Sequence, residues 1–183
     1  MAAAAGIGEL GGKAVDFALP GVDGRLWRLA DVRGRRATLV MFICNHCPYV
    51  QAAVRRIVRD ARELAAHGVG AIAIMPNDTD AYPEDSLENM RTAAAAWDLP
   101  FPYVIDGSQQ VARAYGAVCT PEFFGFNADL VLQYRGRLDV GGRSEVPGAR
   151  REMYEALVAI AASGRGPAEQ VPGFGCSIKW RGS

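Results

Sequence analysis

Cys44 and Cys47 are the residues of this chain whose type and spacing most clearly suggest chemistry. They lie in the stretch FICNHCPYV, residues 42–50, with two residues between them. A thiolate attacks disulfides and peroxides, whereas a close pair of cysteines can also bind a metal, close a loop or pack as small apolar side chains. The secondary structure expected on either side of the two cysteines indicates which of these uses applies.

The position of the pair between two expected elements favours a reactive thiolate. Residues 37–44 form a continuous apolar run, which is typical of a strand buried on both faces. Residues 48–67 place apolar side chains at alternating steps of four and three, which predicts an amphipathic helix. The free N–H groups and the positive dipole end of a helix start stabilise a thiolate. We therefore expect Cys44 to be the exposed attacking thiol, with a lowered pKa, and Cys47 to be the protected resolving thiol.

The residues next to the two cysteines refine this expectation. Pro48 has no N–H to donate and fits the first turn of the helix, with Asn45 as the candidate N-cap. As an imidazolium, His46 would stabilise the thiolate further and make the disulfide more oxidising. Asn45 and His46 are therefore the predicted thiolate-tuning residues.

The order of the remaining patterns predicts an α/β fold with parallel strands followed by an antiparallel pair. A chain of 183 residues with no linker before about residue 163 is expected to form a single domain. Residues 1–14 are expected to be flexible, and residues 164–183 to form a tail that packs on the domain. The other expected elements are two short extended pieces around a turn at 21–24, a strand at 69–75, a helix from Asp85 or Ser86 to about 97, a strand at 101–106, a helix at 108–116, a hairpin of 122–126 and 130–136, and a helix at 149–162.

The composition argues against nucleic acid and membranes as partners. The formal net charge is zero, and no apolar run reaches the roughly 18 residues of a membrane span. The amino terminus lacks the basic region of a signal peptide, so we expect a cytoplasmic protein. In that compartment, two close cysteines are more often catalytic or metal-binding than a permanent disulfide.

Four segments in order make a more specific pattern: CNHCPY, NDTDAYPEDS, YGAVCTPEFFGF and GCSIKW. Together they resemble a bacterial thioredoxin-like group of the alkyl hydroperoxide reductase/thiol-specific antioxidant superfamily, over roughly residues 15–181. The resemblance implies a thioredoxin fold: a central mixed sheet of parallel strands plus a C-terminal antiparallel hairpin, flanked by helices, with an N-terminal extension.

The same resemblance implies a site and its partners. Cys44 would be the nucleophile and Cys47 the resolving thiol of a redox-active disulfide, with no metal or organic cofactor. Pro121 would be cis, and the Thr120 backbone would pair with an extended substrate segment as an added strand. The substrate would be a disulfide-bearing protein or a small thiol, and a dithiol reductase would recharge the pair.

Some residues have no settled role at this stage. The buried acid of thioredoxins, six residues before the first cysteine, is replaced by Thr38, so Asp78 and Glu122 are candidates for its proton-shuttling role. The NDTDAYPEDS loop could cover one rim of the site or only connect two elements. Cys119 could be an additional resolving thiol or a small apolar side chain, and Cys176 could be a structural or a redox thiol.

A thiol-dependent peroxidase is the main alternative. Peroxiredoxins place Thr three residues and Pro seven residues before the nucleophilic cysteine, and counting back from Cys47 gives Cys44 and Val40. The arginine that they place beside the peroxide would fall near Thr120 and Pro121, where this chain has none. These departures favour a thiol–disulfide oxidoreductase over a peroxidase.

A zinc-binding module and a non-catalytic binding module are the second alternative. A single CxxC supplies two zinc ligands, so Cys119, Cys176, His46 or His67 would have to complete the set. A binding module would use the groove around Pro121 without turnover, and the retained pair of cysteines argues against it.

Overall fold

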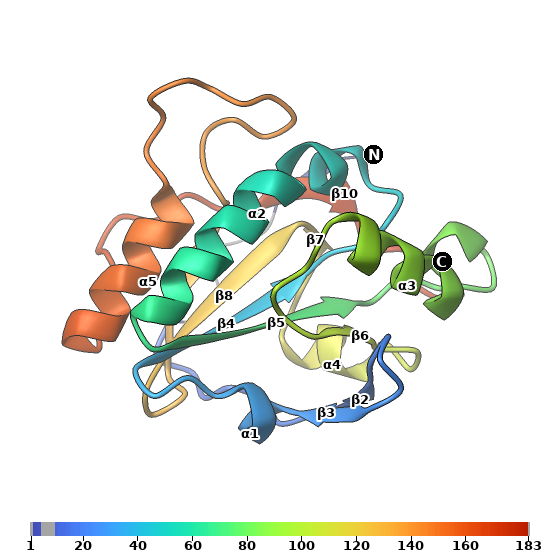
Figure 1. Cartoon of the computed structure of the whole chain (residues 1–183), viewed down its shortest axis with the longest axis horizontal. Helices are drawn as coiled ribbons and strands as arrows, with labels where there is room; N and C mark the ends of the chain where they lie inside the picture. Colours follow the sequence, from blue (N-terminus) through green and yellow to red (C-terminus); the bar gives the residue numbers. More distant parts are fainter. Residues whose placement is uncertain (1, 5–9, 183) are drawn as a thin grey trace.

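The computed structural model describes residues 2–4 and 10–182. At its centre lies a five-stranded sheet in the order β6-β5-β4-β8-β9 (Figure 1). The first three of these strands are parallel to one another, β8 runs antiparallel to β4, and β9 runs antiparallel to β8. This arrangement confirms the predicted mixed sheet with its carboxy-terminal hairpin. The strands are β4 (Ala37–Phe42), β5 (Val69–Met75), β6 (Tyr103–Ile105), β8 (Glu122–Asn127) and β9 (Leu132–Gly136).

The central strand β4 is buried along its whole length. It pairs with β5 on one side and β8 on the other, so its backbone polar groups are satisfied within the sheet. It ends at Phe42 rather than at the predicted residue 44, and the chain then enters the loop that carries Cys44.

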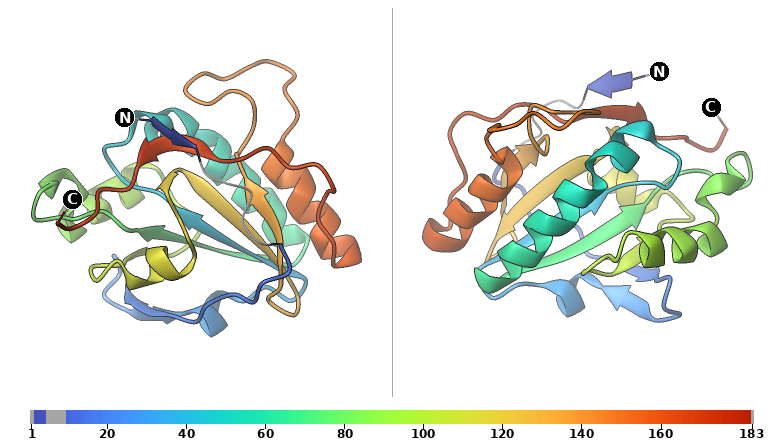
Figure 2. Two further views of the ribbon diagram at one scale, coloured as in Figure 1. Left: turned by 180° about the vertical axis from the view of Figure 1, so that it is seen from behind. Right: turned by 45° about the horizontal axis from the view of Figure 1, so that its top comes forward.

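Helices cover both faces of the sheet (Figures 1 and 2). On one face lie α2 and α5, with α3 near the β6 edge; on the other lie α4, α1 and the small β2–β3 hairpin. The predicted helix at 149–162 begins only at 152, and the one at 108–116 is shorter than expected. The bounds are α1 (Leu29–Val32), α2 (Pro48–Ala66), α3 (Leu87–Ala96), α4 (Gln110–Ala114), α5 (Glu152–Ser163), the 3₁₀ turn η1 (Pro83–Asp85), β2 (Ala18–Pro20) and β3 (Leu26–Arg28).

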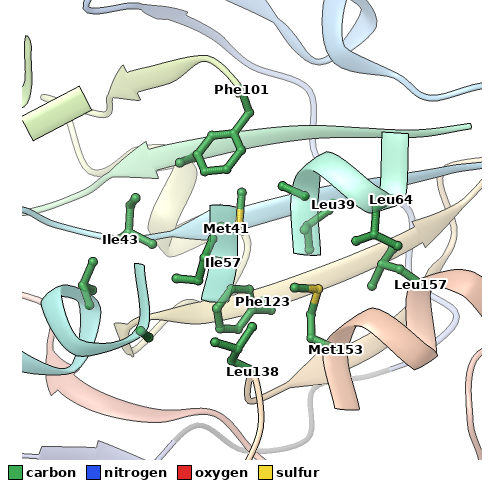
Figure 3. Close-up of a cluster of buried hydrophobic side chains, with 14 of the residues drawn as sticks. Leu39, Met41, Ile43, Ile57, Leu64, Phe101, Phe123, Leu138, Met153 and Leu157 are labelled. Atoms are coloured by element: carbon green, nitrogen blue, oxygen red, sulfur yellow. The ribbon is translucent and has the colours of Figure 1, made fainter. Parts of the chain in front are cut away.

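Alternate side chains of β4 enter two separate cores, as the two-residue period of a strand requires. Leu39 and Met41 point toward α2 and α5, where they meet Ile57, Leu64 and Leu157 (Figure 3). Val40 and Phe42 belong to the core on the opposite face. Each fully buried side chain of this kind contributes roughly 1.5–3 kcal/mol through removal from water. The two cores together hold β4 in place, and its end places the cysteine pair.

A second, three-stranded sheet joins distant parts of the chain in the order β1-β10-β7. It consists of β1 (Ala2–Ala4), β10 (Phe174–Ser177) and β7 (Cys119–Thr120). Figure 2 shows β1 and β10 side by side beyond the amino-terminal end of α2. The carboxy-terminal tail therefore packs on the domain as a strand, and Ile178 after it is buried.

The described parts of the amino-terminal segment, for which flexibility is predicted, make backbone contacts with the domain. Residues 2–4 pair with β10, and the N–H groups of Gly11 and Ala14 donate to the carbonyls of Leu132 and Leu130. The rest of the predicted arm, residues 1 and 5–9, lies outside the described residues. Among the described helices, none is both long and apolar enough to cross a membrane.

Candidate functional site

The cysteine pair lies where the loop after β4 meets α2. The N-cap of α2 is Cys47, and Pro48 is its first helical residue, so the predicted cap at Asn45 is wrong by two positions. Pro48 still occupies the place where a missing N–H costs nothing. Both cysteines therefore lie at the positive end of a 19-residue helix.

Thr120 contacts both sulfurs, each through a different oxygen atom. Its hydroxyl oxygen lies 3.4 Å from the Cys44 sulfur, and its carbonyl oxygen accepts a hydrogen bond of 3.2 Å from the Cys47 thiol. The Thr120–Pro121 peptide bond is cis. Four residues proposed from the sequence, two cysteines and the Thr-Pro dipeptide, thus meet in space.

Burial of the pair contradicts one expectation. Cys44 is 1% exposed and Cys47 is 0% exposed, so the predicted exposure of Cys44 is wrong. The reason is tertiary: β10 lies along β7, and Asp85 from the loop before α3 approaches Cys44. Any external reactant would therefore have to displace this cover before it reaches either sulfur.

The two thiols titrate as a pair rather than independently. The pKa of Cys47 is lowered to about 4, first by the hydrogen bond from Cys44, with smaller help from Cys176, the Val50 N–H and Thr120. The pKa of Cys44 is raised, first by the same hydrogen bond and then by burial and the nearby Asp85 carboxylate. This direction is opposite to the lowered pKa predicted for Cys44, because the Cys44 thiol donates the hydrogen bond that stabilises the Cys47 thiolate, and because Cys44 is buried beside the Asp85 carboxylate.

The pKa directions correspond to a proton on Cys44 and a thiolate at Cys47. The contacts of Thr120 also support the reverse distribution, with the proton on Cys47 and the thiolate at Cys44. When Cys47 holds the proton, its thiol donates to the Thr120 carbonyl, and the Thr120 hydroxyl is free to donate to a Cys44 thiolate. Transfer of one proton from Cys44 to Cys47 converts the first distribution into the second. Once the pair has lost one of its two protons, either sulfur can therefore hold the negative charge.

Asp85 is the acid of this site, and the sequence reasoning did not place it there. Its side chain is 0% exposed and accepts four hydrogen bonds. The donors are the backbone N–H groups of Asn45 at 2.7 Å and His46 at 3.3 Å, the His46 Nδ1 at 2.7 Å and the Asn77 amide at 2.8 Å. A carboxylate with this many donors is held rigidly beside the pair.

The sequence offers Asp85 only as one of two possible caps for the next helix. Ser86 is the other candidate. In the structure Ser86 is the N-cap of α3, and its hydroxyl accepts from the Asn89 N–H at 3.3 Å. Because Ser86 takes this role, Asp85 at the end of η1 is free to turn inward. The NDTDAYPEDS loop thus covers one rim of the site, which is one of the two roles expected for it.

His46 and Asn45 act on Asp85 and its loop rather than contacting a sulfur through a described hydrogen bond. The His46 ring bonds Asp85 through Nδ1 and stacks on Tyr82 with ring centroids 5.7 Å apart. Asn45 donates its side-chain amide to the Glu84 carbonyl and accepts from the Tyr103 hydroxyl at 2.9 Å. Both predicted tuning residues therefore position the carboxylate that faces Cys44.

The two acids proposed as proton shuttles are occupied elsewhere. Asp78 pairs with Arg181 at 3.3 Å. Glu122 is 0% exposed and accepts from the Arg135 Nε at 2.7 Å and from the Val118 N–H at 2.9 Å. Glu122 thus braces the turn that leads to Thr120, and neither acid has a described hydrogen bond to the pair.

Cys119 and Cys176 occupy different positions relative to the pair. Cys119 is 0% exposed, and burial is the first cause that raises its pKa to about 12. Cys176 is half-buried on β10, directly opposite Thr120 in the register of the small sheet. The edge of Thr120 predicted to receive a substrate strand is therefore occupied by the chain's own tail.

A metal is the other use that the residues allow. Cys44, His46 and Asp85 offer donor atoms that all lie within 4.8 Å of one another. The two oxygens of Asp85 already accept four hydrogen bonds, so a metal would have to displace His46 or Asn77 from them. The donor set therefore fits a hydrogen-bonded network better than a metal centre.

A pocket of about 220 Å³ lies on the other side of Pro121. Tyr49 from the first turn of α2 and Phe174 from β10 line it, and their rings pack edge to face at 5.1 Å. Neither sulfur lines this pocket, which adjoins the site without opening onto it.

Comparisons with known proteins agree with this architecture. A crystal structure of an uncharacterized conserved protein from Geobacillus kaustophilus is 43% identical, with a TM-score of 0.93, covering 100% of this chain and 98% of that chain. The hypothetical protein SMc02350 from Sinorhizobium meliloti 1021 is 36% identical, with a TM-score of 0.86, covering 98% and 99%. "Putative peroxiredoxin Rv2521" from Mycobacterium tuberculosis is 26% identical over 133 residues, covering 73% of this chain and 80% of that protein.

More distant structures share the thioredoxin fold alone. One is the thioredoxin domain of the thiol-disulfide oxidoreductase BVU-2223 from Bacteroides vulgatus, 16% identical with a TM-score of 0.58, covering 69% of this chain and 86% of that chain. The printed names of such structures include a thiol-disulfide oxidoreductase and the peroxidoxin BcpB from Mycobacterium tuberculosis, and at 16% and 17% identity their likeness to this chain extends to the fold. The model of the AhpC/TSA family matches residues 10–139, and the chain therefore belongs to the AhpC/TSA family.

Proposed function

We propose that this protein is a thiol–disulfide oxidoreductase that uses Cys44 and Cys47 to reduce or exchange disulfides. The observation that supports it best is the pair of hydrogen-bonded thiols at the start of α2, facing Thr120 beside the cis Pro121. After loss of one proton, a dithiol in this setting shares the remaining proton and one negative charge between its sulfurs. It therefore has both a nucleophile and a second thiol within reach.

Cys44 is the attacking thiol in this proposal. The shared proton moves to Cys47, which donates it to the Thr120 carbonyl, while the Thr120 hydroxyl stabilises the Cys44 thiolate. The Cys44 thiolate attacks one sulfur of the substrate disulfide, and the other sulfur leaves as a thiolate. Cys47 then gives its proton to the substrate thiolate that has already left and attacks the Cys44 sulfur, which forms the Cys44–Cys47 disulfide and releases the second substrate sulfur as a thiolate.

The remaining chemistry follows from this cycle. The substrate is oxidised outside the protein and arrives as a protein disulfide or a small disulfide, and both of its sulfurs leave reduced. A dithiol reductase returns the Cys44–Cys47 disulfide to the dithiol. The cycle needs no metal and no organic cofactor.

Peroxide reduction is the second candidate, and the name of the mycobacterial relative favours it. A peroxiredoxin needs donors that polarise the O–O bond. Arg135 on β9, the strand that pairs with β8, is committed to Glu122 and to the Gly116 carbonyl. Among the described residues, no arginine has a hydrogen bond to either sulfur of the pair. Disulfide chemistry is therefore the better supported use.

A trapping experiment tests the proposal. Cys47→Ser should accumulate a mixed disulfide between Cys44 and substrate, whereas Cys44→Ser should not. Cys119→Ser, a change at a buried cysteine outside the cycle, is the matched control and should behave like the unmodified chain. Trapping on Cys47 in Cys44→Ser alone would reverse the assigned roles.

Turnover and metal content decide between the remaining classes. Turnover of insulin or glutathione disulfide should exceed turnover of hydrogen peroxide in the unmodified chain. The opposite ratio would favour the peroxidase. Absence of any trapped species, together with stoichiometric zinc by elemental analysis, would favour a metal site at Cys44, His46 and Asp85.

A further inference from the structure

The register of the small sheet places a third thiol at the cysteine pair. In the antiparallel ladder of β10 and β7, Cys176 is directly opposite Thr120, and Ser177 is opposite Cys119. Side chains of directly opposed residues extend on the same face of a sheet. The Thr120 side chain faces the Cys44 sulfur at 3.4 Å, so the Cys176 thiol extends toward the same site.

Other contacts of Cys176 agree with this placement. It packs against the core cluster that contains both Cys44 and Cys47. The Cys47 sulfur lies 3.2 Å from the carbonyl oxygen of Thr120, the residue that Cys176 opposes. Burial raises the pKa of Cys176 to about 11, and a hydrogen bond to Cys47 is the next cause. Cys47 is therefore the sulfur of the pair that Cys176 contacts.

Cys119 is the internal comparison. It precedes Thr120 in β7, so its side chain extends on the opposite face of the ladder. Its thiol lies 3.9 Å from the Pro121 carbonyl, and it is 0% exposed. Two cysteines of the same small sheet thus have opposite orientations, and only one of them faces the pair.

We propose that Cys176 is an internal disulfide partner of Cys47, through which the buried pair exchanges disulfides with thiols outside the protein. This inference rests on the proposed function, because it needs the Cys44–Cys47 disulfide as its source. The Cys176 thiolate attacks the Cys47 sulfur, the bond between Cys44 and Cys47 breaks, and Cys44 leaves as a thiolate that takes up the proton lost by Cys176. One disulfide is broken and one is formed, so no external oxidant or reductant is consumed.

Transfer of the disulfide to Cys176 would make it more accessible, because Cys176 is less buried than Cys44 and Cys47. Cys44 and Cys47 are 1% and 0% exposed, whereas Cys176 on β10 is half-buried. A disulfide between Cys47 and Cys176 has one sulfur that an external dithiol can approach. Because β10 occupies the edge where a substrate strand would add, the tail presents Cys176 as a substrate would present its own cysteine.

Trypsin separates the cysteines well enough for a direct test. Cleavage after arginine and lysine places Cys44 and Cys47 in peptide 37–55, Cys119 in peptide 114–135 and Cys176 in peptide 166–179. The Cys44→Ser chain is incubated with glutathione disulfide and digested without reduction. We expect peptide 37–55 linked to peptide 166–179, with two glutathione molecules released for each link.

Three matched variants control this result. Cys44→Ser combined with Cys119→Ser should give the same link, and Cys44→Ser combined with Cys176→Ser should give none. Cys44→Ala replaces Cys44→Ser if the serine variant does not fold. A folded Cys44 variant that oxidises without the 37–55 to 166–179 link, or that links 37–55 to 114–135 instead, would overturn the proposal.

Kinetics separate this inference from the proposed function. Cys176→Ser should still form the Cys44–Cys47 disulfide, but dithiothreitol should reduce that disulfide several-fold more slowly than in the unmodified chain. Equal reduction rates would overturn the proposed exchange through Cys176. If the unmodified chain does not turn over insulin but the Cys44→Ser chain still forms the Cys47–Cys176 link, the proposed function is overturned and the internal link remains supported.

Discussion

Replacement of Asp85 by Asn tests the electrostatics of the site most directly. Asp85 and the Cys44 sulfur lie within 4.8 Å of each other. With an effective dielectric constant of about 20, two unit charges at that distance interact by about 3.5 kcal/mol. One pH unit corresponds to about 1.4 kcal/mol, so full removal of this repulsion would lower the pH at which Cys44 ionises by about 2.5 units. The Asn dipole and the altered partner of His46 reduce this, and we expect a fall of about one to two units.

The measurement needs a background in which Cys44 titrates alone. We would use Cys47→Ser with and without Asp85→Asn, and follow iodoacetamide alkylation against pH on tryptic peptide 37–55. The midpoint should move to lower pH in the double variant, because loss of a negative neighbour favours the thiolate. Asp78→Asn is the matched control, since that acid belongs to the same loop but pairs with Arg181.

Stability provides an independent readout of the same change. An amide keeps one acceptor oxygen for the two backbone N–H groups but loses the bonds from His46 and Asn77. Hydrogen bonds to charged groups contribute about 1.5–3 kcal/mol each, so the free energy of unfolding should fall by about 3 kcal/mol in urea denaturation. A folded Asp85→Asn chain whose Cys44 midpoint stays unchanged, or rises, would refute the assignment of Asp85 as the acid that faces Cys44.

Three further substitutions probe the surrounding groups. Thr120→Val removes the hydroxyl 3.4 Å from the Cys44 sulfur, so the alkylation midpoint of Cys44 should rise by about one pH unit or less; a fall would contradict the support assigned to that hydroxyl. Glu122→Gln breaks the buried pair with Arg135 and should lower the free energy of unfolding by about 3 kcal/mol in urea, with the Cys44 midpoint unmoved; a large shift of the midpoint would restore Glu122 as the acid of the pair. His46→Ala leaves the Asp85 charge uncompensated beside Cys44, which disfavours the reduced form, so the reduction potential measured against glutathione should fall by about 30 mV from a starting value above the roughly −270 mV of thioredoxin. A starting potential at or below that of thioredoxin would remove the argument for His46.

The local patterns of the chain predicted most of the elements that carry the site. The strand at 69–75 is observed at its predicted bounds, and the helix expected over 48–67 spans 48–66. Both were recognisable because burial on a strand or a helix imposes a period on neighbouring residues. The boundaries that moved, such as the start of α5 at residue 152, lie in turns where no such period exists.

The candidate site was predictable only in part. The CxxC spacing and the Thr-Pro dipeptide indicated Cys44, Cys47, Thr120 and Pro121, and these residues do meet. Asp85 was not recognised as a site residue, because it and Ser86 are equally suitable helix caps and only the folded loop decides between them.

The residues themselves therefore establish a thioredoxin-like α/β chain with two thiols at the start of a helix, because these features are encoded within short stretches. The three-dimensional arrangement alone decides the environment of those thiols: Asp85 beside Cys44, the burial of both sulfurs, and β10 laid along β7 with Cys176 opposite Thr120. These contacts join residues tens of positions apart, and a local period carries no information about which distant segment will satisfy an exposed strand edge or a buried carboxylate.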